Sequence, residues 1–125
     1  MAIEGLSKKI LIIDGDHDAA DLMTELLRLS GYDVICVYDS PSAFRVVENF
    51  IPDVVICEIG MPIIDGYKVA VKMRSLPDLK ETRLVALTAW GNAEVRAKGI
   101  AAGFDAHLIK PANLDAILAQ ILLAI

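Results

Sequence analysis

The 125-residue chain has few of the features that mark secreted, membrane or nucleic-acid-binding proteins. Its two cysteines, Cys36 and Cys57, have no CxxC or Cys/His spacing, so we expect two buried, reduced thiols. No apolar run reaches the roughly 20 residues that a membrane span needs, and Met1–Ser7 lacks a signal-peptide pattern. The net charge is −5 and no basic cluster is present. We therefore expect a cytoplasmic protein with protein partners, and no nucleic-acid or membrane partner.

Apolar residues are abundant, at 55% of the chain, which is enough for a hydrophobic core. The length suits one domain. We predict a loose N-terminal segment, residues 1–7, and a single domain over residues 8–125.

Short apolar runs alternate with segments of helical periodicity five times along the chain. This alternation predicts an α/β fold with a mainly parallel sheet covered on both faces. The predicted strands are Lys8–Asp14, Asp33–Val37, Val54–Cys57, Arg83–Thr88 and Ala106–Ile109. The predicted helices are Ala19–Ser30, Ser40 to about Asn49 with Ser40 as the cap, Tyr67–Ser75, Asn92–Ala102, and Leu114–Ala124 with Asn113 as the cap.

A polar residue stands at or just after the end of four predicted strands: Asp14, Glu58, Thr88 and Lys110. The carboxyl ends of parallel strands meet at one edge of a sheet, where ligands gather. We therefore expect these side chains to converge. Two carboxylates, a hydroxyl and an ammonium suit a divalent cation together with a phosphate-like group.

The same segments resemble the receiver domain of two-component signalling over about Lys8 to Ile125. The resemblance is carried by Ile-Leu-Ile-Ile-Asp14, by Pro52-Asp53-Val-Val-Ile-Cys-Glu58-Ile-Gly-Met-Pro62 with Asp65-Gly66-Tyr67, by Val-Ala-Leu-Thr88-Ala89, and by His107-Leu-Ile-Lys110-Pro111. It implies a flavodoxin-like, doubly wound sheet of five parallel strands in the order 2-1-3-4-5 with five helices. It also implies a cis bond between Lys110 and Pro111.

The resemblance further implies a set of functional positions. Receivers accept a phosphoryl group from a histidine kinase on an aspartate that ends the third strand. Two acids after the first strand and a backbone carbonyl hold Mg²⁺, and here Asp14, Glu58 and the Gly60 carbonyl are the matching ligands. Thr88 and Lys110 match the residues that bind phosphoryl oxygens, and a switch aromatic belongs on the fifth strand.

Three positions depart from that pattern, and we predict a degenerate pseudo-receiver. The acceptor position holds Glu58, whose carboxylate stands one C–C bond, roughly 1.5 Å, further from the backbone than that of an aspartate. It either pairs with Lys110 or bonds to Thr88, in partial imitation of a phosphorylated receiver, or is a satisfied acid without a signalling role. Gly15 replaces the second acid, so Mg²⁺ binding should be weak or lost.

His107 occupies the switch position, where it can take an inward or an outward rotamer. It is either a half-exposed histidine on an edge strand or a group that titrates near neutrality. Asp16 is interpreted as a helix cap, with inward rotation toward the metal site as the alternative. Trp90 either anchors a partner or covers its own core.

The resulting hypothesis is a signalling module in phosphorelay signal transduction that acts through contacts with a histidine kinase, an effector or a second copy. We expect no enzyme activity beyond residual self-phosphorylation and dephosphorylation. The alternatives are a working phosphoacceptor that uses Asp14 or Asp16, and a receiver piece of a hybrid histidine kinase. A flavodoxin-like cofactor binder is disfavoured because the loop after the first strand carries three acids, which would repel phosphate. No nucleophile–base pair supports a hydrolase.

Overall fold

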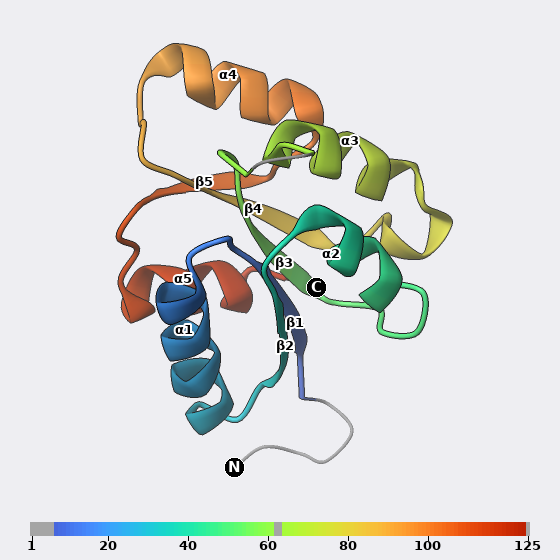
Figure 1. The fold of residues 1–125 in the computed structure, drawn as a ribbon, viewed down its shortest axis with the longest axis vertical. Helices are drawn as coiled ribbons and strands as arrows, with labels where there is room; N and C mark the ends of the chain where they lie inside the picture. The colour runs from blue at the N-terminus through green and yellow to red at the C-terminus, as the bar shows by residue number, and fades with distance from the viewer. Residues whose placement is uncertain (1–6, 62–63, 125) are drawn as a thin grey trace.

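The computed structural model describes residues 7–61 and 64–124 and has an α/β fold with a central five-stranded parallel sheet (Figure 1). The strand order β2-β1-β3-β4-β5 is the predicted one. The strands are β1 (Lys9–Ile13), β2 (Asp33–Val37), β3 (Val54–Glu58), β4 (Arg83–Thr88) and β5 (Ala106–Ile109). The helices are α1 (His17–Leu29), α2 (Ser40–Val46), α3 (Gly66–Ser75), α4 (Ala93–Ala102) and α5 (Leu114–Leu122), with a 3₁₀ turn at Pro77–Leu79.

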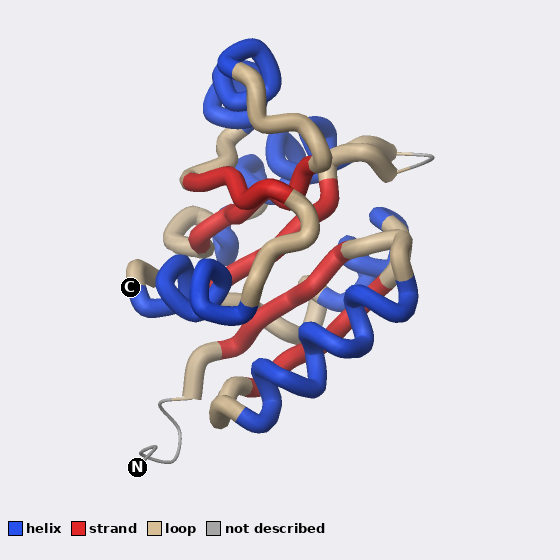
Figure 2. Tube along the Cα trace, turned by 90° about the vertical axis from the view of Figure 1, so that its left-hand side faces the viewer, coloured by secondary structure: helices blue, strands red, loops and turns tan. Residues whose placement is uncertain are grey.

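Helices cover both faces of the sheet (Figures 1 and 2). Successive residues of β1 alternate between two hydrophobic clusters: Leu11 and Ile13 pack with α2 and α3, whereas Ile10 and Ile12 pack with α1 and α5. Side chains of a strand point to opposite faces in turn, so a strand covered on both sides must be apolar throughout. That requirement explains the continuous apolar runs at the centre of the chain.

The helix boundaries differ from prediction by one to three residues, most clearly in α2. Asp39, and not Ser40, caps this helix: its carboxylate accepts a hydrogen bond from the backbone N–H of Ser42 at 2.7 Å. Ser40 is the first helical residue, and its buried hydroxyl donates to the carbonyl of Ile64 at 2.7 Å. Either side chain can cap a helix, so the long-range bond to Ile64 decides the choice.

The ends of the other helices also differ from prediction by one or two residues. The α1 helix begins two residues earlier than predicted because Asp16 is its cap, and Asn92 caps α4 from outside the helix. Residues Val47–Asn49 form a turn after α2, and α5 ends at Leu122. The 3₁₀ turn after α3 was not predicted.

The cysteine prediction is right for one residue and wrong for the other. Cys57 lies on the central strand β3 and is fully buried, and burial raises the pKa of its thiol. Cys36 is only half-buried because β2 is an edge strand. Of the predicted loose N-terminal segment, residues 1–6 lie outside the described residues, and Ser7 donates a hydrogen bond to the Gly31 carbonyl.

Candidate functional site

The carboxyl edge of the sheet brings together the charged residues that the sequence placed there. Asp14 follows β1, Glu58 ends β3, and Lys110 follows β5. The Nζ of Lys110 lies 2.6 Å from Oε2 of Glu58 and 3.2 Å from both carboxylate oxygens of Asp14. One ammonium therefore bridges two carboxylates that come from different strands, and of the alternatives left open for Glu58 the structure has the pairing with Lys110.

Backbone N–H groups also bind one carboxylate oxygen of each acid in this cluster. The N–H of Gly15 donates to Oε1 of Glu58 at 3.2 Å, and the N–H of Asp16 donates to Oδ1 of Asp14 at 3.0 Å. Every carboxylate oxygen of Asp14 and Glu58 thus has a donor. The cluster is a closed, satisfied ion network, which is how a buried charge becomes tolerable.

Burial and charge act against each other at this cluster. Burial raises the pKa of Asp14, whose side chain is 4% exposed, and the nearby carboxylate of Glu58 adds to the rise. For Lys110, burial alone would lower the pKa, but its bonds to Glu58 and Asp14 raise it overall. Lys110 is therefore held in its charged form, and it is the counter-ion of both acids.

These oxygens fit the lysine ammonium better than a divalent cation. A Mg²⁺ ion needs near-octahedral oxygen ligands and carboxylate charge that is free to coordinate it. Here both carboxylates already face an ammonium, and Gly15 adds no acid. Among the described residues, no group of three His, Cys, Asp or Glu side chains is arranged to hold a metal ion.

The other predicted residues at this edge lie around the ion network without joining it. Thr88 is buried at the end of β4, and its hydroxyl accepts a hydrogen bond from the N–H of Trp90 at 3.0 Å instead of bonding to Glu58. A cavity of about 500 Å³ is lined by Glu58, Gly60, Thr88, Trp90 and Lys110, together with Tyr67 and apolar neighbours. Tyr67 was not foreseen as a lining residue, although it directly follows the Asp65-Gly66 turn.

Three further predictions concern Asp16, Trp90 and the proline bond. Asp16 caps α1 by accepting from the N–H of Ala19 at 3.2 Å, so its inward alternative is not adopted. The Trp90 side chain is 69% exposed, so it does not cover its own core. The Lys110–Pro111 bond is cis, as predicted.

His107 makes no bond to the ion network among the described residues. It lies on the edge strand β5 and is half-buried, with its ring against α4. The ring occupies the space beside Gly99, a residue that sequence reasoning missed. A glycine inside a helical pattern was the available signal.

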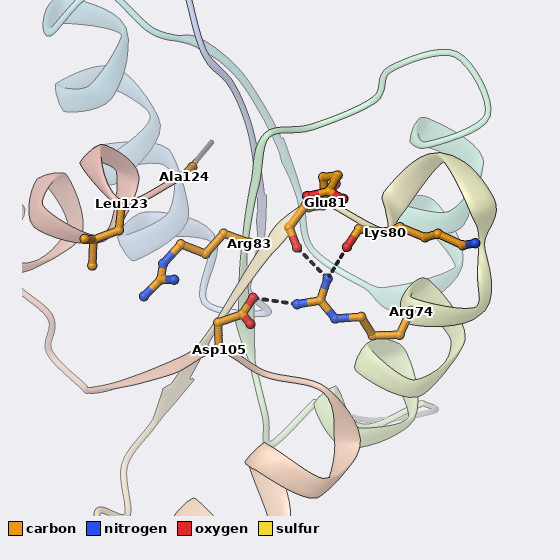
Figure 3. Close-up of a pocket in the computed structure, with 8 residues that line it drawn as sticks. Arg74, Lys80, Glu81, Arg83, Asp105, Leu123 and Ala124 are labelled. Carbon is orange, nitrogen blue, oxygen red and sulfur yellow. Dashed lines mark hydrogen bonds and ion pairs between the residues drawn. The ribbon is translucent and has the colours of Figure 1, made fainter.

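A second polar pocket, of about 280 Å³, lies at the opposite edge of the sheet (Figure 3). Its centre is Arg74, which was not foreseen. The guanidinium donates to the carbonyls of Gly103 at 3.0 Å and Thr82 at 2.6 Å, and it pairs with Asp105 at 2.5 Å. These bonds connect α3 to the turn before β4 and to the turn before β5. Because the guanidinium donates to these groups, it is not free to bind an anion in this pocket.

Comparison with known proteins agrees with this geometry. Residues 10–122 match the family model of the response regulator receiver domain. The transcriptional regulatory protein PrrA of Mycobacterium tuberculosis is 30% identical over 115 residues, which are 92% of this chain and 48% of PrrA. A 14.6 kDa protein of Leptolyngbya boryana is 30% identical over 83% of this chain and 79% of its own length. The chain spans about half the length of the first of these two relatives.

Solved structures show the same fold. A two-component response regulator from Clostridium difficile superposes with a TM-score of 0.85 at 28% identity, covering 93% of this chain and 96% of that one. The chemotaxis protein CheY4 of Vibrio cholerae has a TM-score of 0.90 at 24% identity and covers 95% and 99% of the two chains. None of the helices in residues 7–61 and 64–124 is both long and apolar enough to cross a membrane.

Proposed function

We propose that this chain, which belongs to the response regulator receiver family, is a signalling module that is not phosphorylated in the usual way and acts through contacts with other proteins. The observation that carries the proposal is the ion pair between Glu58 and Lys110 at the acceptor position. In this reading the chain is not an enzyme beyond residual self-phosphorylation and dephosphorylation, and it works in the cytoplasm.

Glu58 is a poor acceptor for two physical reasons. Phosphoryl transfer depends on in-line positioning, and a displacement of about 1 Å can cost about 100-fold in rate. The additional methylene moves the carboxylate by more than that. In addition, both oxygens of Glu58 already accept hydrogen bonds, from Gly15 and Lys110, so an incoming phosphoryl group would have to displace a bonded partner.

Weak Mg²⁺ binding follows from the same network. The residues that match the metal ligands of the family are Asp14, Glu58 and the Gly60 carbonyl. The carboxylates of Asp14 and Glu58 are both paired with the ammonium of Lys110. We propose that Mg²⁺ affinity is low because the ion would compete with an internal ammonium and would find no second acid at Gly15.

The arrangement imitates only half of a phosphorylated receiver. Glu58 engages Lys110, the residue that the resemblance assigns to a phosphoryl oxygen. Thr88, the other residue so assigned, bonds to the backbone of Trp90 instead. We therefore propose a module whose rim is fixed by the ion network and whose output is set by partner binding.

A face on α4 and β5 suits a protein partner. Ile100 on α4, Ile109 at the end of β5 and Trp90 in the loop before α4 expose 67%, 42% and 69% of their surface, and exposed apolar residues of this kind are typical of protein contacts. The partner would be a histidine kinase, an effector or a second copy of the chain. The alternative is that the chain is the receiver part of a longer protein such as a hybrid histidine kinase, since it spans about half the length of PrrA, which it resembles.

Intact-mass measurement after incubation with acetyl phosphate and Mg²⁺ tests the proposal. The parent chain should gain no phosphate. The double variant G15D/E58D should gain one, because it restores the acid pair and the shorter acceptor. A Cβ at Gly15 meets nothing closer than Oε1 of Glu58 at 3.5 Å, so a side chain can begin there without a clash at Cβ. The single variant E58Q is the matched control and should stay unmodified.

The alternative acceptors have their own variants. Asp14 is buried against Lys110, and Asp16 is committed to the cap of α1, so neither is presented to a donor. A stoichiometric phosphorylated parent would overturn the proposal. Loss of that phosphate in Asp14→Asn or Asp16→Asn would then identify the acceptor.

A further inference from the structure

Gly99 is a buried glycine in the middle of α4. Glycine at such a position costs about 1 kcal/mol relative to alanine. A Cβ at this residue would overlap Nε2 of His107 and would lie 2.5 Å from Cε1 of the same ring. The missing side chain therefore leaves the space that the imidazole of β5 occupies, and this contact is part of the fit between α4 and β5.

The imidazole is held there without a polar partner. Its Nε2 is buried and makes no hydrogen bond to any of the described residues. The ring of Phe104 is its aromatic neighbour, with centroids 6.2 Å apart and planes tilted by 60°. A buried polar atom without a partner typically costs about 1–3 kcal/mol, and the cost is larger for a charged group.

The surroundings of the ring disfavour its charged form. Burial lowers the pKa of His107, and the guanidinium of Arg96 on α4 lowers it further. The residue of β4 in register with His107 is the uncharged Ala86. No described residue supplies an acceptor for Nε2 in this conformation.

The other acidic and basic groups near His107, on α4 and before β5, interact with other residues. The ammonium of Lys98 on α4 lies over the ring of Tyr67 on α3, 4.9 Å from its centroid. The charge of Glu94 contributes to the raised pKa of the same Tyr67 phenol. The carboxylate of Asp105, before β5, is paired with Arg74 at the other edge of the sheet. None of them offsets a proton on His107.

We propose that protonation of His107 expels its ring from the space beside Gly99 and changes the fit of α4 against β5, so that this module responds to protons. The proposal rests on the proposed function, because the face that would change carries Trp90, Ile100 and Ile109. A charged imidazole would have neither an acceptor nor water at its buried nitrogen. Outward rotation gives it water and removes the ring from the contact between helix and strand.

The sign of the effect follows from the lowered pKa. The folded chain binds a proton at His107 less readily than the unfolded chain does, so the contribution to stability is fully present above the ordinary value of 6.5. It is lost as the pH falls below that value. The inward ring should therefore dominate at neutral pH and give way in mild acid.

The test is an NMR titration of the whole chain that follows the imidazole resonances and the backbone amides together. The chain has two histidines, and His17→Gln assigns the remaining ring signal to His107. We expect His107 to titrate below 6.5, with amides of α4 shifting at the same midpoint and amides of α2 unaffected. A midpoint at or above 6.5, or α4 amides that do not follow it, overturns the proposal.

Three variants separate a switch from a merely buried side chain. His107→Phe keeps a ring and cannot take a proton, so the shifts of α4 in acid should disappear. Arg96→Gln should raise the midpoint of His107. Gly99→Ala should force the ring outward and give the acid-state amide positions already at neutral pH. If Gly99→Ala does not fold, persistence of the α4 shifts in His107→Phe is sufficient to reject the proposal.

This titration is independent of the phosphorylation assay. Phosphate on the parent chain with a titrating His107 would remove the proposed function and leave the proton response in place. A parent chain that stays unphosphorylated, and whose His107 does not titrate as expected, would support the proposed function and reject the proton response.

Discussion

Replacing Lys110 with methionine tests the ion network that defines the candidate site. Methionine keeps an unbranched side chain of similar length and removes the charge. The two carboxylates, Asp14 and Glu58, then face each other across the edge of the sheet with no cation between them. We expect a clear loss of stability and a changed dependence of stability on pH.

The geometry sets the size of the loss. At separations of 2.6 and 3.2 Å, two unit charges attract by about 6 and about 5 kcal/mol if the effective dielectric constant is about 20. Much of this attraction is offset in the native chain by the cost of removing the three groups from water. The side chains of Lys110, Asp14 and Glu58 remain 24%, 4% and 19% exposed, which allows partial rehydration. Breaking a fully buried pair costs about 3–5 kcal/mol, so we expect a loss of about 2–4 kcal/mol here.

The pH dependence identifies the cause. Burial and the charge of Glu58 already raise the pKa of Asp14, and Lys110 lowers it, so loss of the ammonium should raise the pKa of Asp14 further above its unfolded value. A raised acid pKa means that the folded state binds more protons than the unfolded state, and stability falls as pH rises through the raised value. Relative to the parent, Lys110→Met should therefore recover stability as the pH falls from neutral through the raised pKa of Asp14.

Urea unfolding followed by far-ultraviolet circular dichroism measures both effects. Lys68→Met is the matched control, because this lysine is exposed and has no ion pair among the described residues. The double variant E58Q/K110M should be more stable than K110M at neutral pH, since only one buried carboxylate is left. A loss below about 0.5 kcal/mol, or a pH profile parallel to that of the parent, would refute the reasoning.

Three further predictions concern stability at the opposite edge of the sheet and at the helix ends, and each is measured by urea unfolding. Arg74→Leu should lose about 2–3 kcal/mol because several carbonyls lose a charged donor, and Arg74→Lys should recover only part of it because an ammonium lacks the planar fork. Gly103→Ala should lose more stability than Gly31→Ala. Both glycines have a positive φ, 119° and 96°, but of the two only Gly103 has a neighbour that an added Cβ would meet, Cγ of Arg74 at 2.7 Å. Equal losses would mean that backbone strain alone acts. Lys8→Met should lose about 1 kcal/mol, since the ammonium donates at 3.0 and 2.8 Å to two carbonyls at the end of α5; no change would show that water replaces it.

The parallel sheet and the convergence of Asp14, Glu58 and Lys110 could be predicted because both follow from regular rules, whereas the strand order came from the resemblance to the receiver family. Alternating strands and helices impose a parallel sheet, and a parallel sheet places all carboxyl ends at one edge. The departure at position 58 is visible in the sequence without any coordinates. The pairing of Glu58 with Lys110 was one of the alternatives left open by the sequence, and the structure adds the contact of Lys110 with Asp14.

The remaining features depend on contacts between distant residues, which no local pattern encodes. Ser40 is withdrawn from its expected cap by a bond to Ile64, 24 residues away. The guanidinium of Arg74 reaches the turn before β5. The spacing of residues along α3 does not predict that one of its side chains donates to several distant acceptors. The fit of His107 against Gly99 requires the spacing between a helix and an edge strand, and that distance is set by the whole core.

Trp90 gives this domain a built-in optical probe. It is the single tryptophan of the chain, its indole is exposed, and its backbone N–H is bonded to the Thr88 hydroxyl. An indole in water emits at longer wavelength than one covered by protein. Docking of a partner over this loop should therefore move the emission to the blue without any label, and a titration in a fluorimeter would give its affinity.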